Sequence, residues 1–132
     1  MSSSAPTATP AGTRAFLLPV AGAPVEIWIP LGDGALDAMQ KAVGGYIERG
    51  LVVDGAHGTA ACYFDEEAML KDPRPAINAN LQQLRGPDGG GPVFKLRGPV
   101  LVVIEDDDEG DMLSIPDSVA PADWTTLFVP TE

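Results

Sequence analysis

The sequence predicts an α+β protein, a single small domain in which a mostly antiparallel, mixed sheet packs against one main helix and a short C-terminal helical turn. Three observations carry this prediction. Short stretches rich in β-branched and aromatic residues occur in pairs joined by turns, one amphipathic stretch ends at a double glycine, and residues 100–104 are uninterruptedly apolar. The chain of 132 residues has the length of one domain.

The first two elements are expected to be the strands of a hairpin. Residues 14–20 and 25–29 are rich in strand-forming side chains, and the second stretch alternates apolar and polar residues. Pro19 has no N–H to donate to a sheet, so the first strand should end early or lie at a sheet edge.

One main helix follows this hairpin. Asp33 can cap its start, and Leu36, Met39 and Val43 are spaced by three and four residues, which predicts one apolar stripe. Gly44-Gly45 supplies the left-handed backbone that ends a helix.

A second hairpin is predicted directly after the double glycine. Residues 46–53 and 59–64 have strand character, and the glycines of the intervening segment 54–58 permit a tight reversal. Farther along, residues 76–84 predict a short helix after a proline-rich stretch.

The last elements are a buried strand and a terminal helical turn. Residues 93–104 predict a strand interrupted at Gly98-Pro99, and its part 100–104 is expected to be a central strand with both faces buried. Residues 121–124 can begin a final helical turn packed over this strand.

Composition and charge limit the possible functions. Residues 1–13 are expected to form a tail ahead of a domain at 14–132, and nothing in them resembles a secretory signal, so we expect a soluble, cytoplasmic protein. The net charge is −11, all eight basic residues precede residue 98, and nine of the 19 acidic residues follow it. This acidity disfavours direct binding to nucleic acids or membranes and favours a basic protein partner.

The acidic residues form the main candidate surface. Six carboxylates lie within residues 105–111, but an EF-hand register places Pro116 where the bidentate Glu is needed, so we predict no metal site. The alternatives are a solvated loop, a docking surface and a mimic of the nucleic-acid backbone. The predicted acidic surface consists of Asp65, Glu66, Glu67, Glu105, Asp106, Asp107, Asp108, Glu109 and Asp111.

No complete set of catalytic residues is present, and no cofactor is predicted. Cys62 lies among apolar neighbours with no basic residue beside it, and His57, the sole histidine, lies in a glycine-flanked turn, so neither is predicted to be catalytic. The candidate ligand or partner residues are Tyr46, Glu48, Asn78 and Trp124.

Residues 36–111 resemble the family catalogued as domain of unknown function 3846, found in bacteria, plasmids and phages. The similarity lies in three motifs, MQKAVGGYIE at 39–48, YFDEEA at 63–68 and GPVLVV at 98–103. The chain has DEEA where the family typically has NEEG, and the family's Leu-Pro-x-Asn segment remains only as PAIN at 75–78. The resemblance implies an association with accessory genes of mobile elements, and it implies no activity.

These observations favour a non-catalytic accessory or regulatory module that binds a protein partner through an acidic surface. One alternative is a protein that binds a small ligand or nucleotide derivative in a pocket near Tyr46, Asn78 and Trp124. A second alternative is an acidic nucleic-acid mimic of the anti-restriction type, and an enzyme of unknown chemistry is a third. The oligomeric state is not predicted.

Overall fold

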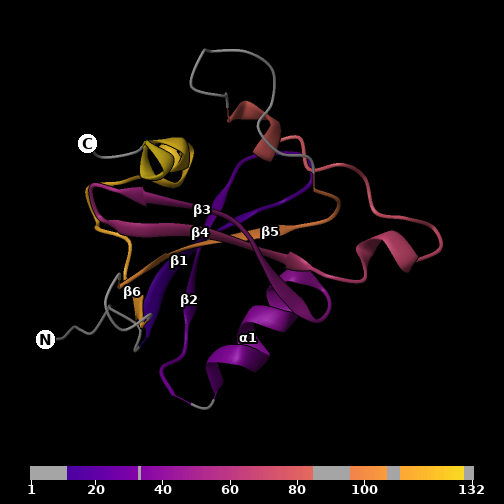
Figure 1. Cartoon of the computed structure of the whole chain (residues 1–132), viewed down its shortest axis with the longest axis horizontal. Helices are drawn as coiled ribbons and strands as arrows, with labels where there is room; N and C mark the ends of the chain where they lie inside the picture. Colours follow the sequence, from indigo (N-terminus) through magenta and orange to yellow (C-terminus); the bar gives the residue numbers. More distant parts are fainter. Residues whose placement is uncertain (1–11, 33, 85–95, 107–110, 130–132) are drawn as a thin grey trace, which may run out of the picture.

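The strands that the structure describes belong to one antiparallel sheet, with strand order β2-β1-β5-β4-β3 and with β6 paired to β5 (Figure 1). The computed structural model describes residues 12–32, 34–84, 96–106 and 111–129. Its elements are β1 (Thr13–Leu18), β2 (Val25–Ile29), α1 (Gly34–Val43), β3 (Ile47–Gly55), β4 (Gly58–Asp65), the 3₁₀ helices η2 (Ala68–Leu70) and η3 (Leu81–Gln83), β5 (Val100–Glu105), β6 (Met112–Leu113) and the 3₁₀ helix η4 (Pro121–Phe128). The predicted α+β domain with one main helix and a C-terminal helical turn is confirmed.

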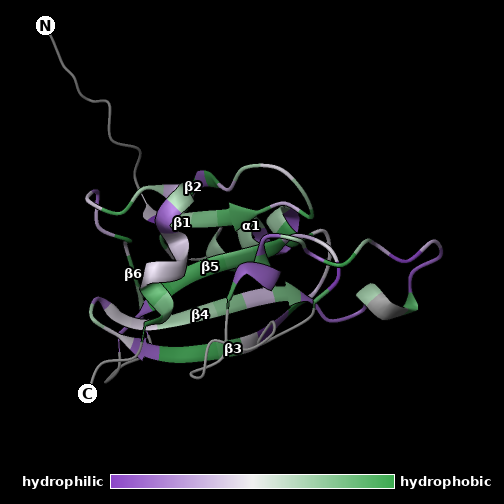
Figure 2. Ribbon diagram, turned by 90° about the horizontal axis from the view of Figure 1, so that it is seen from above, coloured by the Kyte–Doolittle hydropathy of each residue, from purple (hydrophilic) through white to green (hydrophobic). Residues whose placement is uncertain are grey.

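The central strand β5 is buried on both faces, as predicted for residues 100–104. Figure 2 shows it as a hydrophobic strand between β1 and β4. Because side chains alternate along a strand, one set belongs to the core beneath η4 and the other set belongs to the core beneath α1. Val102 and Trp124 belong to the first core, and Leu101 and Met39 belong to the second. The sheet is therefore the middle layer of the molecule, with α1 on one face and η4 on the other (Figure 1).

The buried face of α1 differs from the predicted one by part of a turn. Met39 and Val43 are buried, but Leu36 is exposed, so its place in the predicted apolar stripe is wrong. Ala35 packs against the core instead, because residues 35, 39 and 43 are spaced by four and lie above one another on the helix. Asp33, the predicted cap, lies outside the described residues.

The double glycine ends α1 as predicted. Gly44 has a φ of 87°, and the N–H groups of Gly44 and Gly45 both donate to the carbonyl of Gln40, at 2.9 and 3.0 Å. This satisfies a carbonyl that the last helical turn leaves unpaired. The chain then enters β3 at Ile47.

Two boundaries at the start of the chain depart slightly from expectation. Thr13 is the first residue of β1 rather than the end of the tail, and residues 1–11 lie outside the described residues. Pro19 does end β1, which stops at Leu18, although β1 is an inner strand between β2 and β5.

The predicted helix at 76–84 is wrong, since only Leu81–Gln83 form a short 3₁₀ helix. Ile77 instead makes an isolated antiparallel bridge to Arg97. The reason lies in Asn78, whose buried side chain is held by distant backbone groups, so the chain around it stays extended.

The strand predicted from residue 93 begins only at Val100. Gly98 adopts a φ of 83° and Pro99 follows it, so the interruption expected at this pair instead marks the end of the irregular segment. Residues 93–95 lie outside the described residues.

Candidate functional site

The sheet register separates the predicted acidic residues into two groups. In the pairing of β4 with β5, Thr59 lies opposite Glu105 and Phe64 lies opposite Val100. Asp65 thus ends β4 at one end of the sheet, and Glu105 ends β5 at the other, about 20 Å away at 3.3 Å per residue. We call these the α1 end and the hairpin end, and they do not form one continuous acidic surface.

At the hairpin end, the acidic run begins at the last residue of β5 and ends just before β6. Ile104 pairs with Leu113, and the N–H of Asp106 donates to the carbonyl of Asp111 at 2.7 Å. Asp111 is exposed and Asp106 is partly buried. Asp107, Asp108 and Glu109 lie outside the described residues.

Glu105 is buried, so its assignment to the acidic surface is corrected. Its carboxylate accepts hydrogen bonds from Arg49 Nη2 and from the hydroxyl of Tyr63. Burial, followed by the hydrogen bond to Glu105, raises the pKa of Tyr63 to about 12, and the same carboxylate raises the pKa of Arg49. Tyr63 therefore donates a hydrogen bond as a neutral phenol, and Arg49 supplies the positive charge that neutralises the buried carboxylate.

At the α1 end, Asp65 is also buried, which corrects its assignment in the same way. Its Oδ1 accepts the N–H of Glu67 at 2.9 Å, and its Oδ2 forms an ion pair with Lys71 Nζ at 2.5 Å. Lys71 Nζ also donates to the carbonyl of Gly44 at 2.9 Å. The carboxylate of Asp65 and the ammonium of Lys71 together hold the C-terminal end of α1 against the end of β4.

Four predicted residues remain exposed at the α1 end. Tyr46 has 61% of its surface exposed, and Glu48, Glu66 and Glu67 are exposed around it. The N–H of Glu66 donates to the carbonyl of Tyr46 at 2.9 Å, and Glu48 pairs with Phe64 across β3 and β4. We call Tyr46, Glu48, Glu66 and Glu67 the acidic corner.

The acidic corner borders an open cleft of about 470 Å³ between the last turns of α1 and residues 65–71. Tyr46 and Glu67 line it together with two lysines, Lys41 and Lys71. Both lysines already have acidic partners, since Lys41 pairs with Asp37 at 3.2 Å and Lys71 pairs with Asp65. The cleft therefore combines an exposed aromatic ring with a carboxylate beside it, an arrangement that suits a cationic side chain.

The pocket expected near Tyr46, Asn78 and Trp124 is not formed by these residues. Asn78 is fully buried and donates to the carbonyls of Leu18 and Gly98, at 2.9 and 3.0 Å. Trp124 is fully buried in the core beneath η4, and neither residue lines the cleft that contains Tyr46.

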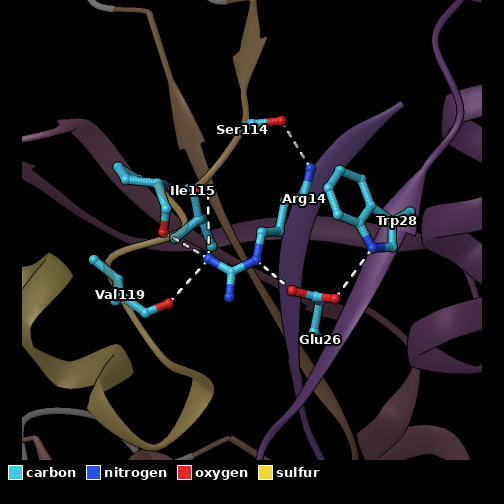
Figure 3. A network of polar contacts seen from close by, with 7 residues as sticks. Arg14, Glu26, Trp28, Ser114, Ile115 and Val119 are labelled. Atoms are coloured by element: carbon cyan, nitrogen blue, oxygen red, sulfur yellow. Dashed lines mark hydrogen bonds and ion pairs between the residues drawn. The ribbon is translucent and has the colours of Figure 1, made fainter. Parts of the chain in front are cut away.

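Arg14 is a structural residue that sequence reasoning did not identify (Figure 3). Its Nε donates to Glu26, and its Nη1 donates to the carbonyls of Pro116 and Val119, at 2.6 and 2.9 Å. Its guanidinium carbon also lies 5.0 Å from the ring centre of Phe16. Arg14 thus ties β1 to the segment that leads into η4. A charged residue within a strand of otherwise mostly apolar residues was the sequence signal that could have identified Arg14.

The other candidate reactive residues do not form a chemical site in the described part of the chain. Cys62 is fully buried, and burial raises the pKa of its thiol to about 12. His57 is exposed in the turn between β3 and β4. The described residues contain no group of three or more His, Cys, Asp or Glu placed to hold a metal ion. Among the helices described, none is long and apolar enough to span a bilayer.

A family model described as domain of unknown function (DUF3846) matches residues 13–128. The chain belongs to the DUF3846 family. The match covers every described strand and helix, so the DUF3846 domain includes both the acidic corner and the β5–β6 hairpin. No curated protein and no solved structure matches the chain.

Proposed function

We propose that this DUF3846 protein is a non-catalytic accessory or regulatory module that binds a basic protein partner through the acidic corner. The observation that carries the proposal is the exposed Tyr46, which lines the cleft together with the exposed Glu67. The exposed Glu48 lies two residues from Tyr46 in the chain, and the exposed Glu66 donates its N–H to the carbonyl of Tyr46. In a solvated position such a tyrosine adds nothing to the core, whereas tyrosines at the centre of interfaces contribute strongly to binding.

Charge supports a basic partner. A net charge of −11 accelerates encounters with a positively charged protein and opposes approach to nucleic acid. A lysine or arginine seated over Tyr46 gains a cation–π contact of about 0.5–2 kcal/mol and lies beside Glu67. The proposal also includes a cytoplasmic setting and an accessory role for a phage or mobile element, which follows the implication of the family resemblance.

Comparative capture from an extract of the cells that express the protein tests this proposal. The immobilised wild-type chain is compared with Tyr46→Ala and with Glu66→Gln/Glu67→Gln, and bound proteins are quantified by mass spectrometry. The matched control is Asp111→Asn/Asp117→Asn, which removes the same two charges from exposed positions outside the corner.

We expect a basic protein that the wild type and the control retain and that both corner variants lose by tenfold or more, about 1.4 kcal/mol. Equal losses with the control and the corner variants would show that only net charge matters. Equal retention by all variants would place the binding surface elsewhere, and saturable binding of a small molecule in the cleft would favour the ligand alternative.

A further inference from the structure

The two edges of the sheet are protected to different degrees. The edge strand β3 has an irregular register between Arg49 and Val52, and its charged residues include Glu48 and Asp54. Its end is also covered by η4, because a Cβ on Gly55 would lie 2.6 Å from the carbonyl oxygen of Leu127. Bulges, charges and coverage are the means by which edge strands avoid pairing with other chains.

Within the described ranges, the opposite edge strand, β2, has little of this protection. Its single charged residue is Glu26. The carboxylate of Glu26 accepts hydrogen bonds from Arg14 Nε and from the indole N–H of Trp28, the latter at 3.2 Å. The hydrogen bond from Arg14 lowers the pKa of Glu26, so this carboxylate stays ionised and paired. Val25, the first residue of the strand, is 45% exposed, and Leu31, two residues past its last residue, is 71% exposed. The result is a regular, apolar edge.

We propose that β2 pairs antiparallel with β2 of a second copy of this chain, about a two-fold axis beside Ile27. In this register Val25 faces Ile29 of the second copy, whose exposed Leu31 follows two residues beyond the strand. The exposed Val25 of each copy therefore comes near the exposed Leu31 of the other. The pairing continues the sheet from one chain into the next.

The sequence of β2 fits a copy of itself better than an unrelated strand. Pro24 and Pro30 flank the strand and have no N–H to donate, so they limit the pairing to the five residues between them in each copy. The symmetric register also places Glu26 opposite Trp28 of the second copy, the same two side chains that already hydrogen bond within one chain. A self-complementary surface of this kind is what a two-fold interface requires.

Electrostatics set the conditions for pairing. The acidic corner lies near the β3 edge of the sheet, and β1, β5 and β4 separate that edge from β2. Two chains of charge −11 nevertheless repel one another, and added salt screens this repulsion. The dimer should therefore strengthen, rather than weaken, with ionic strength. This inference does not depend on the proposed function.

Sedimentation equilibrium of the full chain at about 0.1 mM, a concentration suited to micromolar dissociation constants, tests the pairing. We expect a species with twice the chain mass of 13.7 kDa, and we expect the fraction of chains in this dimer to increase with salt. Val25→Lys should give a monomer, because a lysine on the edge opposes strand addition. Val52→Lys is the matched control, since Val52 is a 40% exposed valine on the other edge strand, and it should remain dimeric.

A wild-type monomer at this concentration in high salt would overturn the proposal, as would equal masses for the two lysine variants. If Val25→Lys fails to fold by circular dichroism, Leu31→Lys changes a residue outside the strand and should also give a monomer. Slow hydrogen exchange along β2 in a monomeric chain would show that another segment of the same chain hydrogen bonds to the outer edge of β2. That result would also overturn the pairing.

Discussion

Replacing Gly45 by alanine tests how the helix end is built. A Cβ on Gly45 would lie 2.5 Å from Oδ1, 2.6 Å from Cγ and 2.7 Å from Oδ2 of Asp65. The carboxylate cannot move aside freely, because it is buried, accepts the N–H of Glu67 and is paired with Lys71. Overpacking of this kind costs about 1–3 kcal/mol. Alanine has fewer conformations than glycine in the unfolded chain, which stabilises the folded protein by about 0.4–1 kcal/mol. We therefore expect Gly45→Ala to lower the free energy of unfolding by about 1–2 kcal/mol.

A double-mutant cycle isolates this clash. Asp65→Ala removes the opposing carboxylate but keeps the gain in the unfolded chain, so in that background Gly45→Ala should stabilise the protein by up to about 1 kcal/mol. The coupling energy is then the overpacking term alone, about 1–3 kcal/mol. Gly44→Ala is the control. Its Cβ would meet nothing within 4 Å, and its cost comes only from the φ of 87°, so it should show no coupling to Asp65.

The assay is urea unfolding followed by tryptophan fluorescence, to which the buried Trp124 and the partly buried Trp28 both contribute. Each variant gives a midpoint and a slope, and the free energies of unfolding complete the cycle. If Gly45→Ala costs the same with and without the Asp65 carboxylate, the close approach does not explain the second glycine and the reasoning fails.

Three further predictions concern buried or paired groups. Arg14 lowers the folded-state pKa of Glu26, so this pair stabilises the fold above the unfolded pKa and the contribution is lost as pH falls through the folded pKa; Glu26→Gln should flatten the acid limb of stability against pH, and an unchanged limb would refute this. The buried thiol of Cys62, with a pKa of about 12, should react with Ellman's reagent only after unfolding, and rapid labelling of the native protein would contradict its burial. Tyr63→Phe removes a donor to the buried carboxylate of Glu105 and should cost about 1–3 kcal/mol in urea unfolding, whereas an unchanged midpoint would show that Arg49 alone suffices.

Local patterns were sufficient to predict most elements of the fold. The apolar run of β5, the two hairpins and the glycine end of α1 follow from residues that are neighbours in sequence. The exposed side of α1 was harder to predict, because three- and four-residue spacings allow more than one apolar stripe, and the position of the helix on the sheet decides between them. Leu36 is exposed for this reason.

The site depended on contacts that sequence patterns do not contain. Arg49 pairs with Glu105 across 56 positions of the chain, so nothing near Glu105 indicates that its charge is buried. The sheet register, rather than any motif, places Asp65 and Glu105 at opposite ends of β4 and β5. For this reason the predicted single acidic surface becomes two separate regions.

Two of the motifs that indicated the family meet in space. The glycine pair of the first motif and Asp65 of the second are in contact at the end of α1, and Lys71 joins them through Gly44. This contact gives both glycines a physical role, since Gly44 supplies the left-handed backbone and Gly45 leaves room for a carboxylate. The same turn places Tyr46 at the surface.

Hydrogen exchange of the protein alone and in complex with a captured basic partner tests the central claim most directly. We expect the partner to slow exchange at residues 46–48 and 66–67, which form the acidic corner, and to leave residues 104–106 and 111–113 of the β5–β6 hairpin unchanged. Protection confined to the hairpin would contradict the account.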